Sequence, residues 1–328
     1  MSRIKTGQVI GLFLVVTAAV LSLVLGSVSI NLSHGFLHPN SIPDGVILWD
    51  ERLPRTLLAL IIGGGLAVAG TAFQALLQNP LADPYIIGVS GGAAVGGTIA
   101  ATLLPFPALG IPVLALTGAA ITTFILYRIS LAKSGRLQIY HLLLTGVVFN
   151  AFAGALILFL RAVLTPQRGV EVLGWLMGSL TMYRPGVFVI AVAGAVVLAG
   201  FAFLFYKARA INAISLGREE AMSMGVDADR LQMHVFIVAS VITGITVAFA
   251  GLIGFVGIIV PHAVRLVFGP DHSKVLPWSL LMGGAFLCLS DIVVRLGFRL
   301  YGSELPVGVF TALVGGPLFI HMLRKTHV

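Results

Sequence analysis

The chain is organised around residues 207–230, KARAINAISLGREEAMSMGVDADR, the longest polar interruption in a sequence that is otherwise almost continuously apolar. Residues 213–224 combine good helix formers with two acids, and Gly217 and Gly225 interrupt them. The pattern therefore predicts two short helices joined by a turn. An ordered polar loop between apolar segments has two interpretations: a docking surface for a soluble partner, or a segment that lies passively on a membrane surface.

The composition identifies the class of protein. Of 328 residues, 58% are hydrophobic and 10% are charged, with a mean hydropathy of +1.05. Soluble domains carry about 25% charged residues, so this chain is predicted to be an all-α polytopic membrane protein. Ten spans of about 20 residues would use about 200 positions. Only short loops remain, so we expect a single membrane domain over residues 1–328 and no soluble catalytic domain.

The distribution of basic residues predicts the orientation. We expect spans at about 9–30, 55–77, 90–106, 109–130, 137–162, 185–206, 229–251, 252–268, 275–296 and 306–323. With both termini in the cytoplasm, Lys and Arg are more numerous in the cytoplasmic segments than in the opposite ones, as the positive-inside rule requires. Residues 207–230 are then cytoplasmic. The net charge of +8 is dispersed over the loops and predicts no nucleic-acid partner.

Small residues recur inside the predicted spans. Gly88, Gly92 and Gly96 follow at four-residue intervals, and three glycines stand at 63–65, a pattern typical of closely packed helices. The AVAG of 67–70 resembles the AFAG of 248–251 five spans later, which is compatible with an inverted repeat. The single cysteine, Cys288, lies in an apolar run, so we interpret it as a small core residue.

Several short patterns in the sequence could mark a catalytic or metal site, and each also has a structural interpretation. No Gly-Lys dipeptide occurs, so the chain has no Walker A loop and any ATPase is a separate polypeptide. Ser90 in GVSG could be a protease nucleophile with His141 or His262 as its base, but its place at the start of a span favours a close-packed helix start. His34 and His38 have a spacing that permits metal binding, although the neighbouring glycine and proline favour a loop. We predict no catalytic residue, cofactor or metal site.

Charged residues within and beside the spans have two interpretations each. Asp291, with Arg295 four residues later, is either an internal ion pair or a proton relay of an ion-coupled secondary transporter. Several arginines at the outer ends of spans either snorkel to headgroups or pair with carboxylates of a protein arriving from outside. These arginines, with Glu304 nearby, are Arg52, Arg55, Arg295 and Arg299.

The segment QNPLADP at 78–84 follows the second span. Its prolines, Pro80 and Pro84, prevent a continuous helix and predict an irregular turn at the cytoplasmic end. Irregular backbone at membrane depth persists where it lines a cavity or is covered by protein. The turn is either a gate or a connector.

Five segments together resemble the FecCD family of ABC-importer permeases, the type II importers for iron–siderophore complexes, haem and cobalamin. The resemblance covers nearly the whole chain. The segments are RLPR at 52–55, QNPLADP at 78–84 with GVSGGA at 88–93, the LG…A…MG pattern at 216–225, GFVGIIVPHAVR at 254–265, and ELPVGVFTALVGGPLF at 304–319.

The resemblance implies a homodimer of ten-helix subunits in a bacterial inner membrane, with a pore on the two-fold axis that works by alternating access. Each subunit would bind one of two ATPase subunits through its cytoplasmic loop, and a periplasmic binding protein would dock at Arg52 and Arg295. Asn79 and Leu81 lie where the family narrows its cytoplasmic exit. Some members have a second constriction of small polar residues where this chain has the bulkier residues 139–141. The implied ATPase-coupling residues are Leu216, Gly217, Arg218, Glu219, Glu220, Ala221, Met224 and Gly225.

The cargo does not follow from the permease sequence. Siderophore, haem and cobalamin permeases share the implied scaffold, and iron–siderophore ranks first only because that group is the broadest.

Overall fold

The computed structural model describes residues 2–104, 107–132, 136–181 and 186–326, and these segments form a bundle of helices. Seven of the helices are long and apolar enough to cross a membrane, and three shorter apolar helices accompany them. The seven are α1 (Ser2–Val24), α4 (Leu53–Leu76), α6 (Pro107–Ser130), α7 (Ile139–Ala162), α9 (Val187–Tyr206), α12 (Ala228–Ala250) and α14 (His272–Tyr301). The three are α5 (Val89–Leu103), α13 (Val256–Phe268) and α15 (Val307–Thr326).

The predicted all-α fold with about ten spans is confirmed, and some boundaries differ. The first helix begins near the start of the chain rather than at residue 9. The second span is preceded by helical turns, so one continuous helical run extends from Asp44 to Leu76. The remaining short helices are α2 (Leu32–Leu37), α3 (Asp44–Val46), η1 (Ile47–Arg52), α8 (Pro166–Leu176), α10 (Ala208–Leu216) and α11 (Arg218–Ser223).

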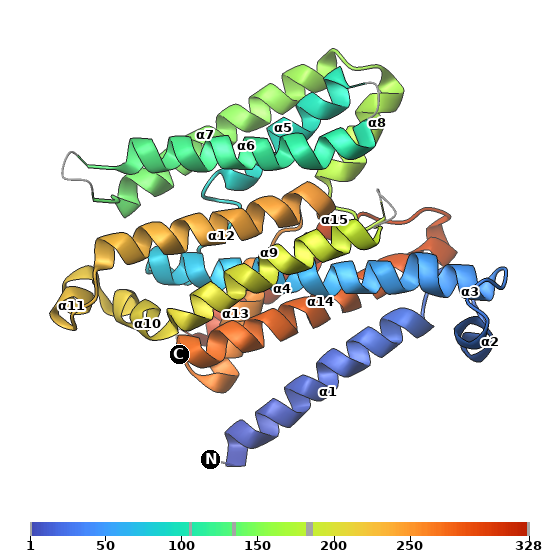
Figure 1. Cartoon of the computed structure of the whole chain (residues 1–328), viewed down its shortest axis with the longest axis horizontal. Coiled ribbons are helices and arrows are strands. Elements are labelled where there is room, and N and C mark those ends of the chain that lie inside the picture. Colours follow the sequence, from blue (N-terminus) through green and yellow to red (C-terminus); the bar gives the residue numbers. More distant parts are fainter. Residues whose placement is uncertain (1, 105–106, 133–135, 182–185, 327–328) are drawn as a thin grey trace.

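Helix α4 is the centre of the bundle. It packs against α9, α12, α13 and α14, while α5, α6 and α7 form a group on the far side of α12 and α1 lies along α14 (Figure 1). Helix α1 begins and α15 ends at the end of the bundle that carries α10 and α11, which we call the α10 end (Figure 1). Helices α2 and α3 lie at the opposite end, which we call the α3 end.

Glycines allow the central helices to touch backbone to backbone. A Cβ added at Gly63 of α4 would lie 2.2 Å from the carbonyl oxygen of Gly283 in α14, and one added at Gly283 would lie 2.3 Å from that of Gly63. A Cβ at Gly96 of α5 would lie 2.0 Å from the carbonyl oxygen of Leu114 in α6. The predicted small-residue faces are therefore helix contacts, and a side chain at these positions would force the helices apart.

Two of the short helices begin in the same unusual way. Helix α5 follows Gly88, with φ +96°, and α13 follows Phe255, with φ +69°, so a left-handed residue precedes each helix. An irregular segment precedes each of them: residues 77–88 connect α4 to α5, and residues 251–255 connect α12 to α13. Since α4 and α12 run in opposite directions (Figure 1), this correspondence fits the predicted inverted repeat.

Candidate functional site

The polar stretch 207–230 forms two short helices, α10 and α11, as predicted. Gly217 separates them with φ +145°, a backbone conformation that favours glycine. Ile211 and Ile214 of α10 and Ala221 of α11 are buried. The loop therefore has its own apolar face packed on the bundle, which fixes its position at the α10 end.

The outer surface of this loop combines apolar and acidic side chains. Leu216, Met222 and Met224 are 67%, 51% and 59% exposed, and Glu219 and Glu220 are exposed beside them. Methionine is enriched in protein interfaces and depleted elsewhere on surfaces. An exposed apolar patch with a charged border is typical of a surface that meets another protein.

An ion pair fastens the start of α11 to α12. Arg218 donates from Nε to Oδ1 of Asp229 at 3.1 Å and from a terminal nitrogen to Oδ2 at 2.8 Å. These hydrogen bonds raise the pKa of Arg218 above its ordinary value. The bidentate geometry orients the guanidinium as well as neutralising it, so α11 is held against the base of a membrane helix.

The predicted gate residues form a closed turn next to α10. The amide of Leu81 donates to Oδ1 of Asn79 at 2.9 Å, and both residues are exposed. A hollow of about 430 Å³ separates this turn from α10. Its lining includes Asn79 and Pro80 from the turn and Ser215 and Leu216 from α10.

Behind the turn, the chain re-enters the bundle without helical structure. The hydroxyl of Tyr85 accepts from the amide of Ile253 at 2.6 Å, and the Tyr85 amide donates to Oδ1 of the buried Asp83 at 2.9 Å. Asn150 of α7 donates to the carbonyl of Tyr85 at 2.7 Å. Protein groups thus replace water for these backbone atoms, which is the condition for irregular structure within a membrane.

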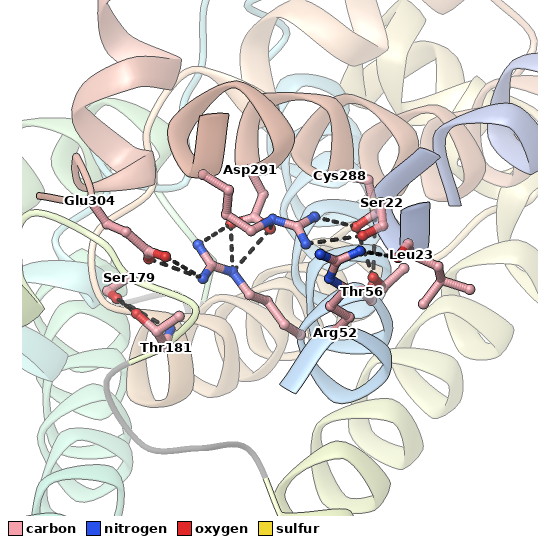
Figure 2. A network of polar contacts seen from close by, with 11 residues as sticks. Ser22, Leu23, Arg52, Thr56, Ser179, Thr181, Cys288, Asp291 and Glu304 are labelled. Carbon is pink, nitrogen blue, oxygen red and sulfur yellow. Dashed lines mark hydrogen bonds and ion pairs between the residues drawn. The ribbon is translucent and has the colours of Figure 1, made fainter. Parts of the chain in front are cut away.

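A network of charges lies at the α3 end, centred on Asp291 of α14 (Figure 2). Arg55 of α4 donates from Nε to both carboxylate oxygens of Asp291, at 2.9 and 3.0 Å. Nε of Arg295 lies 3.0 Å from Oδ2 of the same carboxylate, and Arg55 also pairs with Glu304 at 3.0 Å. The expected Asp291–Arg295 pair is therefore confirmed and extends to a second helix. Asp291 is fully buried, and the guanidinium groups of Arg55 and Arg295 on either side of it are the partners that a buried charge requires.

Arg52 and Arg295 differ from surface docking residues in one respect. Arginines that anchor a partner are exposed, but these are only 4% and 3% exposed. Arg52 donates to the carbonyls of Leu23 and Val24 at 2.8 and 2.6 Å, and Arg295 donates to the carbonyl and hydroxyl of Ser22 at 3.0 and 2.6 Å. Both guanidinium groups therefore donate to carbonyls in the last turn of α1, where helix carbonyls lack a complete set of intrahelical partners.

The two arginines nevertheless line one pocket at the α3 end. Its volume is about 320 Å³, and Arg55 and Glu304 also line it. The side chain of Arg299 lies outside the described residues. The predicted docking residues are thus brought together, in a polar cleft rather than on an exposed surface.

The protease arrangement does not form. Ser90 is buried, and its hydroxyl donates to the carbonyl of Tyr85 at 3.4 Å rather than to a histidine. The ring of His141 packs against Tyr140 on α7. Ser90 therefore serves the start of α5, as the close-packing interpretation expected.

The two histidines four residues apart lie before α4, but the expected loop is wrong there: His34 is in helix α2, and His38 is the residue at its carboxyl-terminal cap. Their ring centroids are 5.0 Å apart, and Nδ1 of His34 lies 3.2 Å from Oδ2 of Asp44. Within the described part of the chain, no three potential ligand side chains are grouped as a metal site would need. Cys288 is fully buried, as predicted for a core residue.

Comparison with known proteins identifies the family. The model of the FecCD transport family matches residues 14–325. The chain belongs to the FecCD transport family. This FecCD chain is 44% identical over 284 residues to the cobalamin import system permease protein BtuC of Halobacterium salinarum, covering 86% of this chain and 74% of that protein.

Two further similarities extend the comparison. The FecCD chain is 33% identical over 285 residues to the hemin transport system permease protein HmuU of Yersinia pestis, covering 85% of this chain and 83% of that protein. A solved structure described as an inward-facing ABC transporter of the metal-chelate type superposes with a TM-score of 0.84 at 30% identity and covers 99% of both chains. The resemblance inferred from the motifs is confirmed.

Sequence reasoning missed the partners of several site residues. Arg55 was grouped with the outer arginines, yet it is the residue that joins Asp291 to Glu304. The RLPR motif at 52–55 and the acid at 291 were both visible, but residues separated by 236 positions are paired only by the fold. Gln78, read as part of a turn, reaches α10 through its side chain.

Proposed function

We propose that this chain is the membrane permease subunit of a binding-protein-dependent ABC importer that moves a metal chelate across a bacterial inner membrane. Support comes from the FecCD family match over residues 14–325 together with the 44% identity to a cobalamin permease. The single membrane domain provides the path, and ATP hydrolysis takes place on separate ATPase subunits. Transport proceeds by alternating access.

The ATPase docks on α10 and α11. Their exposed surface combines Leu216, Met222 and Met224 with Glu219 and Glu220, and the buried face below holds it in place. This places the α10 end, and with it both termini, in the cytoplasm, in agreement with the bias of basic residues. The coupling residues are those named from the sequence, from 216 to 225.

A second copy of the chain completes the pore. Helix α7 exposes Leu144, Val148 and Phe152, and α15 exposes Leu313 and Ile320, so both helices present apolar side chains that lipid or another subunit must cover. We assign these faces to the two-fold axis, with the turn of Asn79 and Leu81 at the cytoplasmic exit.

A periplasmic binding protein docks at the α3 end, over the pocket lined by Arg52 and Arg295. Because both guanidinium groups are bonded within the chain, docking through them requires those bonds to open. The variant pair Arg52→Glu and Arg295→Glu should weaken capture of the binding protein at low salt, where such pairs are strongest. Equal capture by a variant that elutes as a folded protein would remove the arginines from the docking surface.

Cobalamin is the first cargo to test, because the relative with 44% identity is a cobalamin permease. Haem and iron chelates follow, since other relatives carry those descriptions. The pore needs no strong binding site for a bulky chelate, so selection falls to the binding protein.

The test of the proposal is a pair of charge reversals read out by copurification with the ATPase. Glu219→Arg lies on the docking surface, and Glu171→Arg makes the same change in α8, near the α3 end. We expect Glu219→Arg to lose the ATPase and ATP-driven uptake, and Glu171→Arg to retain the ATPase. Retention of the ATPase by Glu219→Arg, or its loss in both variants, contradicts docking at this loop.

The alternative, an ion-coupled secondary transporter that uses Asp291, is not favoured. Asp291 is engaged in ion pairs with Arg55 and Arg295 inside the chain, which is the internal-pair interpretation of this residue. The relatives are also permeases of ABC importers.

A further inference from the structure

Gln78 stands where the central helix α4 gives way to the turn of Asn79 and Leu81. Its backbone has φ +49°, in the left-handed region that few residues other than glycine, asparagine and aspartate adopt. Its side chain extends away from the turn, and Nε2 donates to the carbonyl of Ile214 at 2.8 Å. The unusual backbone conformation thus accompanies a contact with another element.

The acceptor lies in the last turn of α10. Carbonyls at this position of a helix lack a complete set of intrahelical partners. The carbonyl of Ile214 also accepts from the amide of Gly217, at 3.1 Å. Gln78 therefore binds α10 at the point where it turns into α11, beside the proposed docking surface.

A second set of side-chain hydrogen bonds connects α10 to a different element. Nδ2 of Asn212 donates to Oδ1 of Asp271 at 2.9 Å, and its Oδ1 accepts from the amide of His272 at 2.9 Å. Both partners stand at the amino-terminal end of α14. Helix α10 is thus hydrogen-bonded both to the start of α14 and to Gln78 before the turn.

The turn itself is closed by its own bonds. The amide of Leu81 donates to Oδ1 of Asn79 at 2.9 Å, and the amide of Ala82 donates to the carbonyl of Asn79 at 3.1 Å. Among the hydrogen bonds that the structure gives for residues 78–81, the one from the Gln78 side chain is the one that reaches α10. A displacement of α10 is therefore transmitted to the turn through this amide.

We propose that Gln78 is a positioning residue that couples movement of α10 to the turn of Asn79 and Leu81. When the ATPase displaces α10, the hydrogen bond from Gln78 then moves the turn at the cytoplasmic exit of the pore. This proposal rests on the proposed function. It differs from a purely structural cap on α10, which would affect stability and ATPase binding but not the efficiency of transport.

The variants are Gln78→Glu and Gln78→Gly. The first keeps the length of the side chain and removes its donor, and the second removes the side chain while suiting the left-handed backbone. Gln138→Glu is the matched control. It makes the same change near the α10 end, at a glutamine that precedes α7 and whose side chain does not cap that helix.

The first measurement is uptake per ATP hydrolysed by the reconstituted permease–ATPase complex with its binding protein and cyanocobalamin. Loss of one net hydrogen bond of about 1 kcal/mol corresponds to about a fivefold decrease, which we expect for both Gln78 variants and not for Gln138→Glu. A ratio equal to wild type in Gln78→Gly overturns the proposal.

The second measurement needs neither ATP nor cargo. A reporter cysteine, Leu81→Cys, is labelled with a maleimide in the purified permease, where the native Cys288 is fully buried. Release of the turn should increase its labelling rate in Gln78→Gly and leave it unchanged in Gln138→Glu. An unchanged labelling rate in Gln78→Gly overturns the proposal for Gln78, whatever the uptake assay shows. The absence of ATP-driven uptake by the wild-type complex is a different outcome, and it would refute the proposed function.

Discussion

Replacing Asp291 by asparagine tests the charge network at the α3 end. The substitution keeps the size of the side chain and removes a charge that lies between two buried arginines, at 2.7 Å from Arg55 and 3.0 Å from Arg295. Breaking a buried ion pair from one side leaves an uncompensated charge and costs about 3–5 kcal/mol. Arg55 retains its ion pair with Glu304, whereas the hydrogen bonds that remain to Arg295 go to the neutral Ser22, so a destabilisation within this range is expected.

The assay uses the single cysteine of the chain. Cys288 is fully buried one turn from Asp291, so a thiol-reactive dye reports its exposure as the purified protein unfolds on heating. For a chain of 328 residues, 1 kcal/mol corresponds to about 1.5 °C, so we expect Asp291→Asn to lower the Tm by at least about 4 °C. The control, Glu304→Gln, removes a carboxylate whose side chain is 32% exposed, and the Tm should fall by less than half as much.

A double variant tests whether the loss of stability comes from the unpaired charge. Asp291→Asn combined with Arg295→Met removes the uncompensated cation, so the double variant should be more stable than Asp291→Asn alone. A Tm of Asp291→Asn equal to that of wild type would refute the account of the network. So would a double variant whose Tm loss equals the sum of the two single losses.

Three further perturbations have defined outcomes. Gly63→Val should prevent α4 from approaching α14 and reduce the yield of folded protein in size-exclusion chromatography. Gly154→Val should leave the yield unchanged, because no atom lies within 4 Å of a Cβ added there, and equal yields of the two variants would contradict the packing. Arg52→Met should lower the Tm by the equivalent of about 1–3 kcal/mol, because it leaves carbonyls at the end of α1 without a donor, and an unchanged Tm would show that water replaces it. Hydrogen bonds from Asn212 and Ser273 lower the pKa of Asp271, so the stability that its carboxylate contributes is present above about pH 4 and is lost as the pH falls below that value. Asp271→Asn should therefore flatten the acidic part of the Tm–pH curve. A curve identical to that of wild type would show that Asp271 does not cause the acid sensitivity.

The sequence predicted the parts of the fold that depend on local pattern. The apolar runs indicated the spans, Gly217 indicated the break between α10 and α11, and the glycines at 63–65 indicated close contact. The predicted start of the second span, at about residue 55, was less accurate, because helical turns over residues 44–52 precede Leu53. No periodic apolar pattern marks such turns.

The candidate site was predictable only as a set of separate motifs. The i,i+4 spacing indicated the pair of Asp291 with Arg295, but Arg55 comes from another helix and was found only in the fold. Outer arginines were expected on the surface, and Arg52 is instead bonded to the end of α1. A guanidinium can bind a partner, a headgroup or a helix terminus, and sequence patterns do not distinguish these acceptors.

We propose that this chain is a conduit whose shape is changed by a separate ATPase bound at α10 and α11. The most direct measurement is cyanocobalamin entry into vesicles that contain the permease, its ATPase and its binding protein, with ATP or a non-hydrolysable analogue on the ATPase side. We expect accumulation with ATP, none with the analogue, and none with ATP when Glu219→Arg replaces the wild type. Accumulation at the same rate in vesicles that contain the permease alone, without nucleotide, would contradict it.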